Sequence, residues 1–168
     1  MKRIFIVTFI FLIGNNLTAQ TKKELKEAQK NEDYQSNKVI IESGEYFFKP
    51  ISASTEDGRV FNFNNDKSIL TIIGNHSLAA LPYLGATQMD KSTDSTSIGS
   101  ITYQNDKINY NIKYNNKRKK IYIKFTTQTD DENFDIILTV SGKNKALLSI
   151  RSIRRDPIKY YGFVSKID

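Results

Sequence analysis

The chain has 168 residues, a formal net charge of +7 and no cysteine. This length predicts one domain with a sizeable core. The lack of cysteine excludes disulfides, zinc–thiolate sites and thiol nucleophiles, so we expect the core to carry stability unaided.

Residues 1–19 have the order of a secretory signal peptide. A basic start, Met1 to Arg3, precedes the apolar stretch IFIVTFIFLI, and Leu17-Thr18-Ala19 offers a cleavage point. The stretch is short for a membrane anchor, because a spanning helix needs about 20 apolar residues. The alternatives are an uncleaved anchor or a core strand. Cleavage would leave no cysteine for a lipid anchor, so we expect a periplasmic or secreted protein without a membrane span.

Residues 21–43 are the helical candidate. Thr21 and Glu24 fit a capping box, and Gly44 fits a helix stop. Apolar residues are sparse before residue 39, so we expect the first half of the helix to be solvated and the second half to dock on a sheet. The expected organisation is a signal peptide at 1–19, a polar helical segment at 20–37 and one β-rich domain at 38–168.

Patterns typical of strands begin after Gly44. Residues 68–73, SILTII, form a nearly continuous apolar run, which predicts a strand covered on both faces. Residues 77–81 predict a short strand that Pro82 ends, because proline cannot donate a ladder hydrogen bond. Residues 88–97 are rich in Ser, Thr and Asp and predict a flexible loop.

The second half of the chain alternates apolar and polar residues more strictly. The apolar series are Ile108 to Tyr114, Ile121 to Phe125 and Phe134 to Val140, and two further strands are expected at 145–153 and 160–164. Short polar loops join these runs, and no crossover helix separates them. The sequence therefore predicts a mostly β (α+β) fold, an antiparallel meander forming a sandwich or small barrel with one N-terminal helix.

Several segments together resemble one protein family. They are GEYFFKP, ILTIIGNHSLAALPYLG and ALLSIRSIRRDPIKYYGFV. The most specific marks are LPYLG and a closing Arg-x-x-x-Ile-x-Tyr-x-Gly pattern, here Arg154, Ile158, Tyr160 and Gly162. Over residues 38–166 the chain is similar to the DUF4251 family of secreted proteins from Bacteroidetes. The resemblance implies the family's fold and location, but no functional residues, because the family has no established activity.

Two residues of LPYLG, Tyr83 and Leu84, form the first candidate binding site. Pro82 and Gly85 allow a tight turn that would direct both side chains inward, where they would plug one end of the sheet. Alternatively, they form an exposed apolar lip that docks a ligand or partner. The sequence leaves both interpretations open.

Basic residues form the second candidate site. The run Lys117, Arg118, Lys119 and Lys120 predicts a hairpin tip whose charges prevent edge pairing. Alternatively, the run joins Arg151, Arg154, Arg155 and Lys159 in a surface for anionic glycans or lipid headgroups. We expect no nucleic-acid partner, because a secreted protein does not ordinarily meet one.

The sequence contains no convincing catalytic constellation. His76 is the only histidine, which is too few for a triad or a usual metal site. One acidic loop contains Asp130, Asp131 and Glu132, and another contains Asp90 and Asp94. A calcium site would require the two loops to bring their carboxylates together. We expect no cofactor, no metal and a non-catalytic module of the cell envelope that binds an apolar or anionic ligand or a protein partner. The alternative is an envelope hydrolase that uses the acidic loop carboxylates, with or without calcium.

Overall fold

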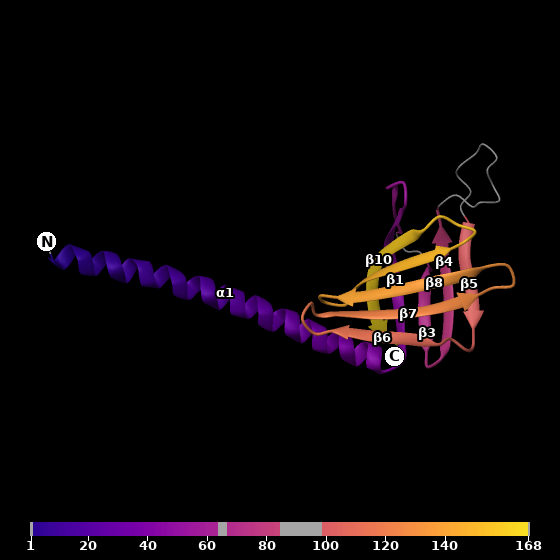
Figure 1. Ribbon diagram of the computed structural model, residues 1–168, viewed down its shortest axis with the longest axis horizontal. Helices are drawn as coiled ribbons and strands as arrows, with labels where there is room; N and C mark the ends of the chain where they lie inside the picture. The colour runs from indigo at the N-terminus through magenta and orange to yellow at the C-terminus, as the bar shows by residue number, and fades with distance from the viewer. Residues whose placement is uncertain (1, 64–66, 85–98, 168) are drawn as a thin grey trace.

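A computed structural model describes the backbone of residues 2–63, 67–84 and 99–167, with side chains from residue 21 onward. One helix, α1 (Lys2–Glu42), precedes the strands (Figure 1). The strands are β1 (Glu45–Thr55), β2 (Val60–Asn62), β3 (Ile69–Ile73), β4 (His76–Tyr83), β5 (Gly99–Asn105), β6 (Tyr110–Asn115), β7 (Lys120–Gln128), β8 (Asn133–Ser141), β9 (Lys145–Ser152) and β10 (Ile158–Lys166).

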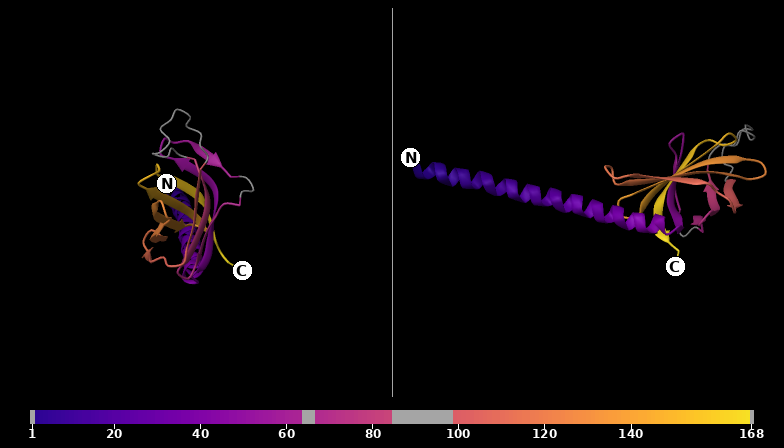
Figure 2. Two further views of the ribbon diagram at one scale, coloured as in Figure 1. Left: turned by 90° about the vertical axis from the view of Figure 1, so that its right-hand side faces the viewer. Right: turned by 60° about the horizontal axis from the view of Figure 1, so that its bottom comes forward.

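The strands form a single antiparallel sheet. Their order is β5-β4-β3-β1-β10-β9-β8-β7-β6, and β2 pairs with β1 outside this path. The sheet thus contains two meanders, β3 to β5 and β6 to β10, with β1 inserted between them. The sheet bends so that β3, β4 and β5 cross behind β7 and β8 (Figures 1 and 2). The predicted antiparallel, mostly β fold is confirmed, but the edge strands β5 and β6 do not pair to close a barrel.

Alternation of side chains builds the core as predicted. On β7 the side chains of Ile121, Ile123 and Phe125 are buried. Their register partners on β8 are Val140, Leu138 and Ile136, which are buried as well. Since successive side chains of a strand point to opposite faces, the residues between these positions lie on the outer face of the sheet. The two ends of the bent sheet meet where the rings of Tyr103 and Phe134 stack, with centroids 6.3 Å apart.

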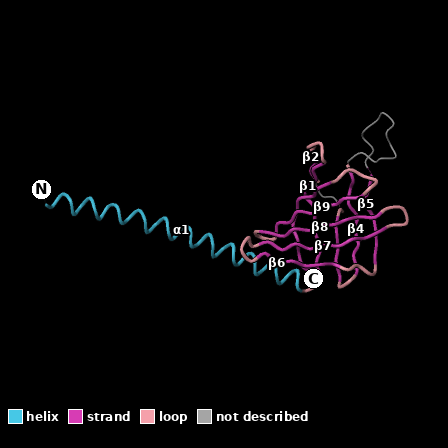
Figure 3. Tube along the Cα trace, in the orientation of Figure 1, coloured by secondary structure: helices cyan, strands magenta, loops and turns pink. Residues whose placement is uncertain are grey.

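The C-terminal part of α1 docks on the sheet, as predicted. Tyr34, Asn37 and Ile41 are buried, at the spacing of one helix face, whereas residues 21–32 are exposed. The Asn37 amide donates a hydrogen bond to the backbone oxygen of Gly142 (2.6 Å). The rest of the helix projects away from the sheet (Figure 3).

The boundaries of α1 differ from the prediction at one end. The helix stops after Glu42, and Gly44 has the positive φ of a helix terminator (69°). Thr21 lies inside the helix and does not cap it, because the preceding residues are helical too. Within the described residues, no helix is long and apolar enough to cross a membrane.

Two predictions about β3 and β4 are wrong. Pro82 does not end β4, which runs to Tyr83. Since β3 pairs with β4 only as far as Ala80, Pro82 has a neighbouring strand on one side only, where proline is tolerated. β3 is not covered on both faces, because Ile73 lies on the outside of the bent sheet and is 46% exposed. The predicted loop at 88–97 lies outside the described residues.

At Gly162 the backbones of β10 and β1 leave no room for a side chain. A Cβ atom there would lie 2.0 Å from the Lys49 backbone oxygen and 2.8 Å from the Pro50 Cα. The register of β1 shifts between Pro50 and Ser52, which is the sign of a bulge. The glycine of the closing sequence pattern is therefore required by packing between two backbones.

Candidate functional site

A groove runs along the outer face of β7, β8 and β9 and extends to the end of β5 and the β5–β6 connection. It consists of two adjoining hollows of about 750 Å³ and about 540 Å³. Thr126, Asp135 and Arg151 line both hollows, which makes the groove continuous. We call it the outer groove; the polar residues that line it are Asn105, Lys107, Asn109, Lys124, Thr126, Thr127, Gln128, Asn133, Asp135, Ser149, Arg151 and Ser152.

Strand register explains why these side chains gather. Thr126 pairs with Asp135, and Asp135 pairs with Arg151, so the three lie side by side across three strands. Gln128 and Asn133 are register partners at the next outward position. The groove thus combines amides, hydroxyls, a carboxylate and cations, which can donate and accept many hydrogen bonds.

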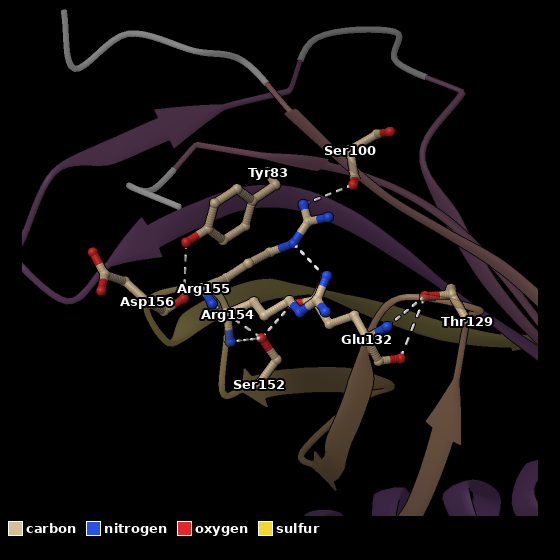
Figure 4. Close-up of polar contacts among 8 residues, drawn as sticks. All are labelled: Tyr83, Ser100, Thr129, Glu132, Ser152, Arg154, Arg155 and Asp156. Atoms are coloured by element: carbon tan, nitrogen blue, oxygen red, sulfur yellow. Dashed lines mark hydrogen bonds and ion pairs between the residues drawn. The ribbon is translucent and has the colours of Figure 1, made fainter. Parts of the chain in front are cut away.

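The second polar feature is an ion pair beside the groove, between the buried Glu132 and the half-buried Arg155 (Figure 4). The Glu132 Oε2 atom accepts a hydrogen bond from the Arg155 Nε (2.8 Å), and its Oε1 accepts one from the Ser152 hydroxyl. The Nη1 of Arg155 also donates to the backbone oxygen of Ser100 (2.9 Å). We call these residues, with Tyr83 and Asp156, the Glu132 cluster.

Tyr83 lies inside this cluster. Its side chain is fully buried, and its hydroxyl donates to the backbone oxygen of Asp156 (3.1 Å). The Arg155 guanidinium carbon lies 5.1 Å from the centre of the Tyr83 ring, a cation–π distance. Burial raises the pKa of Tyr83 to about 12. Leu84 is half-buried, so the structure turns Tyr83 fully inward and Leu84 only in part.

The geometry of the Glu132 cluster favours a structural role. The cluster joins β5, the edge strand at one end of the bent sheet, to the β7–β8 and β9–β10 loops, which belong to the other half of the sheet. Both oxygens of Glu132 already accept hydrogen bonds from Ser152 and Arg155. A catalytic carboxylate must reach a substrate, whereas both oxygens of Glu132 are engaged by protein groups. This carboxylate therefore holds the segments together.

The other acidic residues remain apart from this cluster. Asp130 and Asp131 are exposed in the β7–β8 loop, whereas Asp90 and Asp94 lie outside the described residues. Among the residues that the structure describes, no group of three or more His, Asp or Glu side chains could hold a metal. His76 is exposed, with its Nδ1 3.3 Å from an oxygen of Asp106.

The predicted basic residues occupy two separate places. Lys117 and Arg118 are exposed at the tip of the β6–β7 hairpin. Lys119 donates to the Asn31 side chain of α1 (2.8 Å) and lies 5.5 Å from the Tyr34 ring centre, so it contacts the helix.

Lys120 begins β7 and pairs with Ser141, the last residue of β8. The loop that contains Arg154 follows Ser152 of β9, which pairs with Phe134 near the start of β8. Lys120 and Arg154 therefore lie near opposite ends of β8. Arg154 is exposed, and Arg155 lies in the Glu132 cluster. The structure therefore does not join the hairpin run to Arg154 and Arg155.

These features define a β protein built on one bent antiparallel sheet, with a polar groove outside and a part-buried ion pair beside it. The domain of unknown function DUF4251 matches residues 28–164. The chain belongs to the DUF4251 family, which confirms the resemblance found in the sequence.

A solved structure supports the fold. The crystal structure of a DUF4251 family protein from Bacteroides eggerthii DSM 20697 is similar to this chain with a TM-score of 0.61. The match has 13% sequence identity and covers 83% of this chain and 91% of that chain. At this identity the likeness concerns the fold alone. The comparison with curated proteins found no match.

Proposed function

We propose that the protein is a non-catalytic binding module of the bacterial cell envelope, and that the outer groove binds a hydroxyl-rich ligand such as a glycan segment. The observation that carries this proposal is the continuous lining of amide, hydroxyl and charged side chains around Thr126, Asp135 and Arg151. Sugar hydroxyls both donate and accept hydrogen bonds, as these side chains do. A few converging polar groups in a concave surface provide orientation and specificity.

The number and position of the carboxylates in the groove support binding without cleavage. Most glycoside hydrolases use two carboxyl groups on either side of the scissile bond. Among the described residues that line the groove, Asp135 is the one carboxylate. Glu132 cannot serve as its partner without giving up the hydrogen bonds from Ser152 and Arg155.

The envelope location is a proposal that rests on the pattern of residues 1–19, with a basic start, an apolar stretch and a small residue at the cleavage point. N-terminal sequencing of the protein from a periplasmic fraction tests it. A mature chain that begins at Gln20 supports the location. A cytosolic chain that retains Met1 contradicts it.

Affinity electrophoresis tests the groove. The protein is run through gels that contain peptidoglycan fragments, xylan or dextran, and retardation measures affinity. The double variant Q128A/N133A removes two groove amides without a change in charge. Since a hydrogen bond contributes about 0.5–1.5 kcal/mol, the loss of two should lower the affinity about fivefold or more.

The matched control is Q104A/N111A, which removes one glutamine and one asparagine that are exposed outside the groove. The control should keep the affinity of the unmodified protein. Equal losses in both variants, or no retardation by any glycan, would contradict the proposal. Release of reducing ends by the protein that is lost in Asp135→Asn would instead establish a hydrolase.

A further inference from the structure

A second surface on the outer face of the sheet contains regularly spaced lysines. Lys120 of β7 pairs with Ser141, and Ser141 pairs with Lys145 of β9. Lys145 pairs with Phe163 of β10, and Phe163 pairs with Lys49 of β1. We call these five residues the lysine row. Because neighbouring strands are about 4.8 Å apart, a lysine recurs about every 10 Å along the row.

Aromatic and aliphatic side chains lie next to this row on the same face. One outward position further along the strands, Tyr122 pairs with Thr139, Thr139 with Leu147, and Leu147 with Tyr161. The rings of Tyr161 and Phe163 are 43% and 42% exposed. Exposed rings between lysines provide flat apolar surfaces beside positive charges.

A third row, whose Lys124 and Ser149 also line the outer groove, continues the charge pattern. Lys124 pairs with Ile137, Ile137 with Ser149, and Ser149 with Lys159. The three rows together contain Lys49, Lys120, Lys124, Lys145 and Lys159, and they contain no carboxylate. Within the described residues, Lys120, Lys124, Lys145 and Lys159 form no ion pair. This face therefore has a positive potential that attracts anions.

We propose that the lysine row binds a linear polyanion, of the class of acidic polysaccharides. A row of evenly spaced cations matches a chain whose negative charges recur along its length, and the ring of Phe163 can stack on a sugar ring between two of them. A flexible chain can follow the curvature of the bent sheet, whereas a flat membrane would contact only part of the row. The buried residues Tyr34 and Ile41 of the helix belong to the core, so the helix packs on the inner face and reaches the row only at its end, where Asn37 contacts Gly142 beside Ser141.

The lysine row is independent of the outer groove. The row crosses β7 and β9 at Lys120 and Lys145, whereas the groove crosses the same strands at Thr126 and Arg151. Variants of Lys49, Lys120 and Lys145 therefore leave the groove intact, since none of these residues lines it.

The test measures binding of the full chain to heparin and to polygalacturonate at several salt concentrations, with dextran as the uncharged glycan. The variant K49Q/K120Q/K145Q removes the charges of the row. Each cation that contacts a polyanion releases counterions, so the slope of log affinity against log salt should fall by about one per lysine, and the affinity by at least about tenfold.

The matched control is K22Q/K23Q/K26Q, which makes the same change in net charge on the exposed part of α1. It should keep the slope and the affinity within twofold. The variant F163S should weaken polygalacturonate binding and leave the slope unchanged, because it removes a ring and no charge. Far-UV circular dichroism establishes that each variant is folded, and K49R/K120R/K145R should retain binding.

Three results would overturn the proposal. The first is an equal loss of affinity in the control triple variant. The second is that neither polyanion binds, or that K49Q/K120Q/K145Q binds both as tightly as the unmodified protein. The third is binding to phosphatidylglycerol vesicles that K49Q/K120Q/K145Q abolishes while both polysaccharides fail to bind, which would assign the row to a membrane surface. None of these results bears on the groove, which is tested by Q128A/N133A.

Discussion

The substitution Gly162→Ala tests the packing of β1 on β10 most sharply. The new methyl group would lie 2.0 Å from the Lys49 carbonyl oxygen, 2.8 Å from the Lys49 carbonyl carbon and 2.8 Å from the Pro50 Cα. These atoms belong to a backbone, so a change of side-chain rotamer cannot relieve the contact. β1 is also held on its other side by β3, which limits how far it can move.

The magnitude follows from this geometry. Overpacking a well-packed interior costs about 1–3 kcal/mol and more where the backbone must shift. A glycine-to-alanine change in an open site would instead stabilise the fold by about 0.4–1 kcal/mol, through the unfolded state. We expect Gly162→Ala to lower the free energy of unfolding by about 3 kcal/mol or more, a large part of the 5–15 kcal/mol of a typical domain.

Urea unfolding followed by far-UV circular dichroism measures this difference. Gly99→Ala is the control, since a Cβ there would meet its nearest atom, the Arg155 Nη1, at 3.6 Å, an ordinary contact. The control should differ from the unmodified protein by less than about 1 kcal/mol. A Gly162→Ala protein within about 0.5 kcal/mol of the unmodified protein would refute the argument.

Three further predictions concern buried polar groups. Glu132→Ala leaves the Arg155 side chain, which is 23% exposed, without its carboxylate partner, and should lower the free energy of unfolding in urea by about 3 kcal/mol. The control Asp131→Ala changes an exposed neighbour and should stay within about 0.5 kcal/mol of the unmodified protein. Equal effects of the two variants would contradict the ion-pair role. Because burial raises the pKa of Tyr83 from 10.0 to about 12, the unfolded state loses this proton first; the stability that it contributes is present below about pH 10 and is lost from there to about pH 12. Tyr83→Phe should therefore make stability fall less steeply between pH 10 and 12, by about 1.4 kcal/mol per pH unit, and an unchanged slope would be contrary to the prediction. Asn37→Ala should cost about 1 kcal/mol, because it removes the hydrogen bond to Gly142; no loss would indicate that the helix docks without it.

Local alternation explains which parts of the fold could be predicted from the sequence. Ile121, Ile123 and Phe125 recur at every second position, and this period alone assigns them to one face of a strand. The same period extends back from Phe134 to Glu132, so it also contained a sign that this carboxylate points inward. The period alone does not predict burial of Glu132, because an acidic residue in a polar loop is more often exposed.

The sites depend on register, which alternation does not determine. Lys120 and Lys145 belong to one row only because each is paired with Ser141 across two hairpins. The partner of Glu132 comes from the loop after β9, where no periodic pattern exists. The Pro82 prediction was wrong for a related reason: the sequence does not reveal that β3 pairs with β4 only as far as Ala80.

The most direct test of the binding account is amide chemical-shift mapping of the isotope-labelled full chain, titrated with peptidoglycan fragments, xylan oligosaccharides and dextran. The account predicts that at least one of these glycans shifts amide signals concentrated in residues 124–128, 133–137 and 149–153, the strand segments that line the outer groove. Shifts concentrated elsewhere on the sheet, or no shifts with any of the three glycans, would contradict it.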